Sequence, residues 1–229
     1  MERIPTGIKG LDELIQGGFK NGSVNLITGD PGAGKTVFAL QFLFEGLRRG
    51  EACLYVTFEE RKKKLYDDMI GFGIDLEKFE KAGLFVFLAY TPEQVKKLLV
   101  EGGGTIDAII SKSKIKRLVI DSITSFALLY QDRLLQKEAA LELFDLIESW
   151  GCTALVTSQN TVSEESTVNA ALEFEVDSIL ILYHVRIKGE RKRALEILKM
   201  RGTKHPNKTF AVEIDSTGMK INPKELIVF

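Results

Sequence analysis

Residues 29 to 36 read Gly-Asp-Pro-Gly-Ala-Gly-Lys-Thr, and their types and spacing suggest phosphate chemistry. They match G-x-x-x-x-G-K-[ST] at every fixed position, between apolar runs at 24–27 and 37–40. Glycines let the backbone turn its N–H groups toward phosphate oxygens, and a following helix presents its positive end to the same anion. We expect Lys35 to reach the β- and γ-phosphates and Thr36 to ligate Mg²⁺. The predicted nucleotide contacts of the loop are Gly29, Asp30, Pro31, Gly32, Ala33, Gly34, Lys35, Thr36 and Val37.

A second acidic anchor for magnesium is predicted at Asp121. The run 117–121, Arg-Leu-Val-Ile-Asp, is an apolar strand that ends in a carboxylate. Such a strand places its charge at the carboxyl edge of a parallel sheet, beside the phosphate loop, where a nucleotide-bound cation needs it. The alternative is that Asp121 caps the helix that follows, a role for which Ser122 and Thr124 compete.

Hydrolysis would also need a carboxylate that orients or deprotonates water. Glu59 and Glu60 follow the strand-like run 53–58, and a carboxylate pair in that place is seldom needed for packing. Mutual repulsion would raise the pKa of one of the two and favour a basic role near neutral pH. The alternative is a pair of solvated glutamates opening the next helix, whose basic start at 61–64 we interpret as a solvated face and not a nucleic-acid contact.

The elements that must position these residues alternate between short β-branched or aromatic runs and longer segments of helical period. This pattern predicts an α/β fold with a mostly parallel central sheet flanked by helices. After residue 175 the apolar runs become shorter and lack helices between them, which predicts antiparallel strands extending the sheet. The expected strands are 24–28, 53–58, 84–88, 116–120, 153–158, 177–183, 193–200 and 209–214, with crossover helices at 36–49 and 134–150.

Composition narrows the possible classes of protein. With 229 residues, 45% of them hydrophobic, the chain can bury one sizeable core, so we expect a single domain over 1–229. A formal net charge of -1 gives no global attraction to nucleic acid or an anionic membrane. Cys53 and Cys152 stand beside apolar runs without a second ligand at metal spacing, and we expect reduced core thiols. Neither an N-terminal signal region nor a membrane-spanning run is present in the sequence, which predicts a cytoplasmic protein.

Taken together, five motifs resemble those of the RecA-superfamily ATPases, and within them the single-domain KaiC-like proteins. The resemblance covers almost the whole chain and implies a RecA-like P-loop NTPase fold. The motifs are "RIPTGIKGLDELIQGGF" at 3–19, "GDPGAGKT" at 29–36, "FEE" at 58–60, "LVIDSITSF" at 118–126 and "LKMRGTKH" at 198–205.

The resemblance also implies functional roles. Glu59 and Glu60 would act on the attacking water, and Ser158 or Gln159 would lie where relatives sense the γ-phosphate. It implies a homo-hexameric ring that binds ATP or ADP with Mg²⁺ between subunits. Lys199 and Arg201 would then contact phosphates bound by the neighbouring subunit, a trans cation that stabilises charge on the transferring group. From the residues alone, Lys199 and Arg201 would be strand-end charges. KaiC clock proteins carry two such domains, which argues against a circadian role for this chain.

Two uses of the ATPase are considered first, a regulatory switch that binds an unknown protein partner and a DNA recombination accessory of the RecA or RadA type. In recombinases the loops after 116–120 and 153–158 line the DNA path. Residues 160–177 here contain five acidic residues and no Lys or Arg, and this charge would repel phosphates. We therefore favour a switch, which slow hydrolysis would suit, over nucleic-acid binding. A third hypothesis is autophosphorylation, at hydroxyls such as Thr161, Ser163, Ser166 and Thr167.

Overall fold

The computed structural model describes residues 2–91, 93–94, 96–97, 102, 104–124, 130, 132–159 and 175–228. The hydroxyls Thr161, Ser163, Ser166 and Thr167, and most of the acidic stretch 160–177, lie outside these residues.

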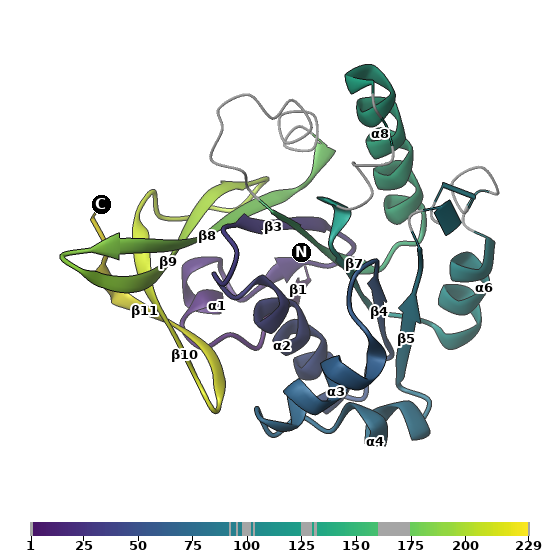
Figure 1. Ribbon diagram of the computed structural model, residues 1–229, viewed down its shortest axis with the longest axis horizontal. Coiled ribbons are helices and arrows are strands. Elements are labelled where there is room, and N and C mark those ends of the chain that lie inside the picture. Colours follow the sequence, from purple (N-terminus) through teal and green to yellow (C-terminus); the bar gives the residue numbers. More distant parts are fainter. Residues whose placement is uncertain are drawn as a thin grey trace.

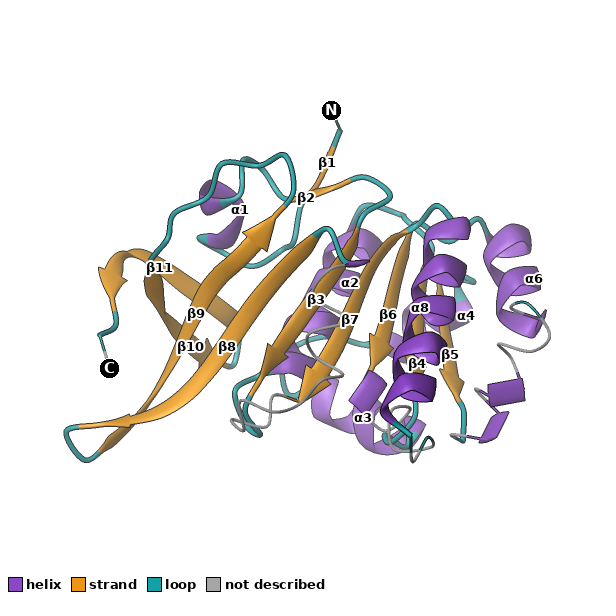
Figure 2. Cartoon of the chain, turned by 90° about the horizontal axis from the view of Figure 1, so that it is seen from above, coloured by secondary structure: helices purple, strands orange, loops and turns teal. Residues whose placement is uncertain are grey.

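A nine-stranded sheet forms the centre of the molecule, with the order β11-β10-β9-β8-β3-β7-β6-β4-β5 (Figures 1 and 2). The strands from β3 to β7 are parallel, and β8 also pairs parallel with β3. Beyond β8 the pairing becomes antiparallel. The predicted fold class is therefore confirmed. The parallel strands are β3 Val24–Gly29, β4 Cys53–Thr57, β5 Phe85–Ala89, β6 Arg117–Asp121 and β7 Thr153–Gln159, and the later ones are β8 Ser178–Ile187, β9 Glu190–Met200, β10 Thr209–Asp215 and β11 Gly218–Leu226.

Helices cover both faces of the parallel part of the sheet. On one face, α2 packs with α3 and α4 over a core that includes Phe38, Leu43 and Met69. On the other face, α6 and α8 cover a second core that includes Ile110 and Phe144 (Figure 2). The bounds are α2 Lys35–Arg48, α3 Lys62–Ile70, α4 Leu76–Lys81, α6 Gly104–Ser113 and α8 Arg133–Ser149.

The N-terminal segment forms a small separate sheet that the hydrophobic pattern did not predict. Strand β1, Arg3–Ile4, pairs antiparallel with β2, Phe19–Lys20, and the short helix α1, Leu11–Leu14, lies between them in sequence. Two-residue strands are too short to show an alternating pattern, so periodicity could not have indicated them.

Both cysteines are core residues, as expected. Cys53 and Cys152 are buried free thiols, one in each of the two cores. None of the described helices is both long and apolar enough to cross a bilayer.

Candidate nucleotide site

The phosphate loop joins β3 to α2 at the carboxyl edge of the parallel sheet. Helix α2 begins at Lys35, so the loop's last glycine, Gly34, is its N-cap residue, and the N-terminal N–H groups of the helix face the loop. Lys35 Nζ donates hydrogen bonds to the backbone carbonyls of Gly29 (2.7 Å) and Asp30 (3.0 Å). Burial lowers the pKa of the Lys35 ammonium, against the opposing effect of Asp121, Asp30 and Glu59. The Lys35 ammonium, the cationic group of the motif, is thus hydrogen-bonded to the backbone of its own loop.

Side chains of neighbouring strands approach the glycines of this loop closely. Gly34 has φ +105°, and a Cβ there would lie 2.6 Å from Cδ1 of Ile214 in β10. A Cβ on Gly32, with φ +77°, would lie 3.3 Å from Nδ1 of His184 in β8. These positions leave little space for side chains, so backbone groups line the space next to Lys35.

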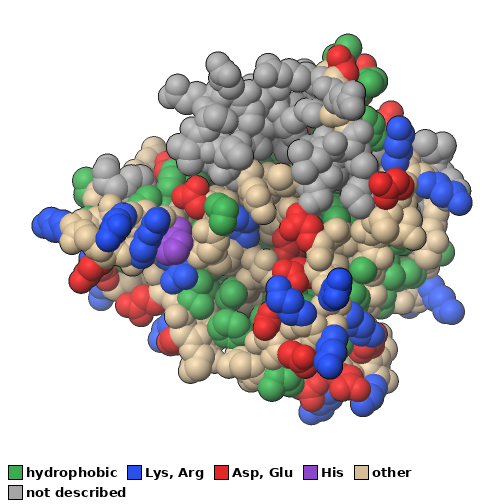
Figure 3. Space-filling model, viewed as in Figure 1, with side chains coloured by type: hydrophobic (Ala, Val, Ile, Leu, Met, Phe, Trp, Pro, Cys, Tyr) green, Lys and Arg blue, Asp and Glu red, His purple; other side chains and the backbone are tan. Residues whose placement is uncertain are grey.

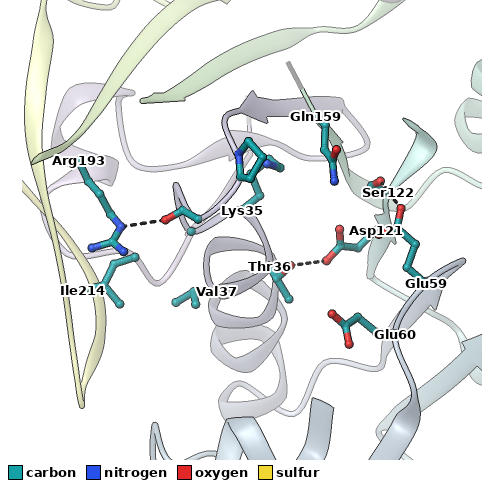
Figure 4. Close-up of a pocket in the computed structure, with 13 residues that line it drawn as sticks. Lys35, Thr36, Val37, Glu59, Glu60, Asp121, Ser122, Gln159, Arg193 and Ile214 are labelled. Carbon is teal, nitrogen blue, oxygen red and sulfur yellow. Dashed lines mark hydrogen bonds between the residues drawn. The ribbon is translucent and has the colours of Figure 1, made fainter. Parts of the chain in front are cut away.

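Asp121 ends β6 beside the first turn of α2, as predicted. Its Oδ2 atom accepts a hydrogen bond from Thr36 Oγ1 at 2.9 Å (Figure 4). The same oxygen accepts from Tyr55 OH (2.9 Å), and Oδ1 accepts from Thr157 Oγ1 (2.5 Å). The described partners of this side chain are hydroxyls on three other elements and not backbone N–H groups of the residues after it, which contradicts the helix-capping alternative. Burial and then Asp121 raise the pKa of Tyr55 well above its ordinary value, so the phenol stays a donor.

The donor set at Thr36 and Asp121 fits magnesium. Mg²⁺ prefers hard oxygen ligands and is usually held by one or two carboxylates together with substrate phosphates. A hydroxyl and a carboxylate in contact provide that chemistry. No cluster of three His, Cys, Asp or Glu residues within the described ranges could hold a metal ion by itself. Mg²⁺ held by a hydroxyl and one carboxylate would complete its coordination with phosphate oxygens and water.

Glu59 and Glu60 follow β4 and are turned apart. The Thr57 hydroxyl accepts hydrogen bonds from both of their backbone N–H groups, at 3.2 and 3.0 Å. Glu59 Oε1 accepts from Ser122 Oγ at 3.3 Å, next to Asp121, whereas Glu60 Oε2 lies 3.4 Å from Lys64 Nζ on α3. Both side chains line the site's cavity, with Glu59 beside Ser122 and the half-buried Glu60 paired with Lys64, so the helix-opening alternative accounts for the Lys64 contact of Glu60 only. The basic start of α3 at 61–64 is exposed, as expected.

A cavity of about 460 Å³ brings most of the predicted residues together (Figure 4). Gln159 lines it, but Ser158 does not, because Ser158 is buried in β7 with its hydroxyl 3.4 Å from Thr124 Oγ1. The predicted loop contacts Gly29, Asp30 and Ala33 are also absent from its wall. The cavity is lined by Pro31, Gly32, Gly34, Lys35, Thr36, Val37, Glu59, Glu60, Asp121, Ser122, Gln159, Arg193 and Ile214.

Arg193 and Ile214 reach this cavity from the antiparallel strands, and neither was predicted from the sequence. Arg193 Nε donates to the carbonyl oxygen of Gly32 at 3.1 Å. The same hairpin carries further exposed basic side chains at 186, 188, 191 and 192, and Figure 3 shows basic groups at that end of the molecule. The run Arg191-Lys192-Arg193 after Gly189 is a signal for a basic hairpin, but only the pairing of the strands shows that Arg193 meets the loop.

Lys199 and Arg201 do not lie in this cavity. Lys199 of β9 pairs with Ile179, which pairs with Leu26 in β3, three residues before the loop begins at Gly29. At about 3.3 Å per residue this separates them by roughly 10 Å along the strands. Arg201 comes after the end of β9, farther still from the loop, and its side chain is exposed.

Known proteins resemble this chain over nearly its whole length. A sequence model of the KaiC ATPase family matches residues 4–226. A protein of Thermotoga maritima named UPF0273 protein is 34% identical over 238 residues, which cover 98% of each chain. The circadian clock protein KaiC3 of Synechocystis is 34% identical, over 100% of this chain and 46% of that protein.

A solved structure shows the same fold. The KaiC-like protein of Pyrococcus horikoshii aligns with a TM-score of 0.86 and 34% identity, over 97% of this chain and 99% of that one. Matches that extend over nearly the whole chain cover the phosphate loop, the strand ending in Asp121 and the antiparallel strands alike. The chain belongs to the KaiC family of ATPases, nucleotide-binding proteins of the RecA superfamily.

Proposed function

We propose that this protein is a Mg²⁺-dependent ATPase whose nucleotide state regulates a ring-shaped assembly. The observation that carries the proposal is the convergence, in one cavity, of Lys35, the Thr36–Asp121 pair and the carboxylate of Glu59. A cation for phosphates, oxygen ligands for a metal and a carboxylate for water are the parts that phosphoryl transfer to water requires.

Each residue has a distinct role in this proposal. Lys35 leaves its loop carbonyls to bind the β- and γ-phosphates. Thr36 and Asp121 hold Mg²⁺, which supplies positive charge to neutralise the phosphate oxygens. Glu59 orients the attacking water and accepts its proton, and Glu60, which lines the same cavity, assists. Gln159, at the end of β7, contacts the γ-phosphate and reports its loss. The predicted part of Ser158 is limited to positioning, because its hydroxyl faces Thr124.

The ring is the second part of the proposal. We infer one domain over 1–229 that assembles into hexamers, with ATP or ADP at each subunit interface. Lys199 and Arg201 are too far from the phosphate loop of their own chain to serve it, which supports a role in the neighbouring subunit's site. Hydrolysis would be slow, as suits a switch that binds a protein partner.

DNA recombination is less well supported. The stretch 160–177 contains five acidic residues and no Lys or Arg, whereas phosphate neutralisation by Lys and Arg supplies most non-specific affinity for DNA. The autokinase alternative has no observation in its favour among the described residues.

Nucleotide binding and hydrolysis can be separated by experiment. Glu59→Gln keeps the size of the side chain and removes its basicity, so it should lower kcat by about 100-fold or more while ADP affinity stays unchanged. Lys35→Ala should weaken nucleotide binding itself. Glu77→Gln, in the exposed Glu77–Lys81 pair of α4, is the matched control and should behave as wild type. Hydrolysis that persists in Glu59→Gln would remove that residue from the chemistry, and absence of ATP binding by wild type would refute the proposal.

A further inference from the structure

Tyr55 is a buried tyrosine whose hydroxyl reaches the candidate metal site. It lies in β4 with none of its surface exposed, and its ring stacks on Phe87 of β5 with centroids 5.8 Å apart and planes at 14°. A phenylalanine would meet the same packing requirement. The phenolic oxygen instead lies 2.9 Å from Asp121 Oδ2. Burying a hydroxyl is unfavourable unless it is hydrogen-bonded, so the hydroxyl needs an explanation beyond packing.

The carboxylate of Asp121 is held from both sides. Strand β6 lies between β4 and β7, and each neighbour contributes one hydroxyl, Tyr55 from β4 and Thr157 from β7. Thr36 of α2 provides the third hydroxyl and shares Oδ2 with Tyr55. Of these three donors, Thr36 belongs to the proposed metal site, whereas Tyr55 and Thr157 are absent from the cavity lining. Their hydrogen bonds fix the rotation of the carboxylate and keep Oδ2 directed at Thr36.

We propose that Tyr55 is a positioning residue for the metal site, which raises the affinity for Mg²⁺ by holding the Asp121 carboxylate in the orientation that faces Thr36. The inference rests on the proposed function and adds a determinant that the phosphate-loop motif does not contain. Partners that hydrogen-bond a metal ligand typically change metal affinity by about 10- to 100-fold when removed, because the free ligand must then be ordered at the moment of binding.

The test is the substitution Tyr55→Phe, which removes only the hydroxyl. The affinity for a fluorescent ADP analogue is measured at equilibrium across a Mg²⁺ titration. We expect the Mg²⁺ concentration that gives half of the maximal increase in analogue affinity to rise by about 10-fold in Tyr55→Phe. Affinity for the analogue in the presence of EDTA should stay as in wild type, since Tyr55 does not touch the nucleotide cavity. If Tyr55 contributed only to folding, Tyr55→Phe would instead shift the midpoint of thermal unfolding and leave the Mg²⁺ titration unchanged.

The control is Tyr66→Phe, which removes a similar hydrogen bond away from the site. Tyr66 OH lies 3.1 Å from Glu80 Oε2, between α3 and α4. This variant should titrate with Mg²⁺ as wild type does. Equal titrations of Tyr55→Phe and wild type would overturn the inference, and so would equal losses in Tyr66→Phe and Tyr55→Phe. If the affinity of the wild-type protein for ADP does not depend on the Mg²⁺ concentration, the proposed metal dependence is refuted instead. Failure of the proposed function can therefore be distinguished from failure of the inference about Tyr55.

Discussion

A single carbonyl oxygen explains why residue 29 is glycine. Gly29 ends β3 with φ +151°, and a Cβ there would collide with the backbone carbonyl of Leu182, its partner in β8. We expect Gly29→Ala to destabilise the protein by about 2–4 kcal/mol, from backbone strain and steric overlap, and to weaken ADP binding because the loop begins there. Urea unfolding and ADP titration measure the two effects.

The matched control separates strain from overlap. Gly73 also has a positive φ, +74°, but a Cβ there meets nothing within 4 Å. Gly73→Ala should therefore cost only about 1–2 kcal/mol and leave ADP affinity unchanged. If both variants lose the same stability, the close approach to β8 has no energetic importance.

At this scale, the sequence predicted those site residues whose positions follow from local spacing. Lys35 and Thr36 belong to one contiguous motif, and Asp121 could be placed because parallel strands end at one edge of the sheet. Arg193 and Tyr55 could not be predicted, since each reaches the site only through strand register and a long side chain. Ser158 and Gln159 were left as alternatives, and only Gln159 lines the cavity, because neighbouring residues of a strand point to opposite faces.

At the scale of elements, the parallel strands were predictable because buried strands form continuous apolar runs. Strand β8 continues past its predicted end to Ile187, and β9 begins earlier than predicted, at Glu190. The polar and basic residues in this hairpin interrupt the apolar pattern from which strands are predicted. Strand β11 was missed because Asn222, Pro223 and Lys224 interrupt its pattern, which an edge strand tolerates.

One buried side chain joins three elements at the opposite edge of the sheet. Arg117 begins β6 with none of its side chain exposed, and its Nε is 2.5 Å from Glu51 Oε2. Its Nη1 donates to the carbonyls of Pro5 (2.7 Å) and Phe42 (2.9 Å), and the guanidinium lies 4.8 Å from the Phe42 ring centroid. The N-terminal segment, α2 and β6 are thus held by one guanidinium.

Removing this guanidinium should be costly. Arg117→Met keeps most of the volume but removes the guanidinium that pairs with Glu51 and donates to the carbonyls of Pro5 and Phe42, so we expect the free energy of unfolding in urea to fall by about 2–4 kcal/mol. Arg48→Met is the control, because Arg48 is exposed and lies 3.6 Å from Glu45. That change should stay within about 0.5 kcal/mol. Comparable stability of the two variants would show that the buried network contributes little.

At the scale of the whole molecule, the sheet separates two sets of phosphate-binding candidates. Lys35 and Arg193 lie at the edge where β3 ends, whereas Lys199 and Arg201 lie where β8 begins. A head-to-tail arrangement of subunits would bring one set against the other, and such heterologous contacts form a ring when the rotation between subunits closes. Each interface would then contain one phosphate loop and one pair of trans cations from different chains.

Mixing two inactive variants tests this arrangement. Lys35→Ala lacks a working loop and Arg201→Ala lacks a trans cation, so each alone should hydrolyse ATP poorly. In an equal mixture about one quarter of the interfaces would pair an intact loop with an intact Arg201, and activity should recover to about that fraction of wild type. A mixture of Lys199→Ala with Arg201→Ala, which share the damaged side of the interface, should recover much less. Light-scattering mass must show that every variant and mixture still assembles. If assembled mixtures of Lys35→Ala and Arg201→Ala stay inactive, Arg201 does not act in the neighbouring subunit.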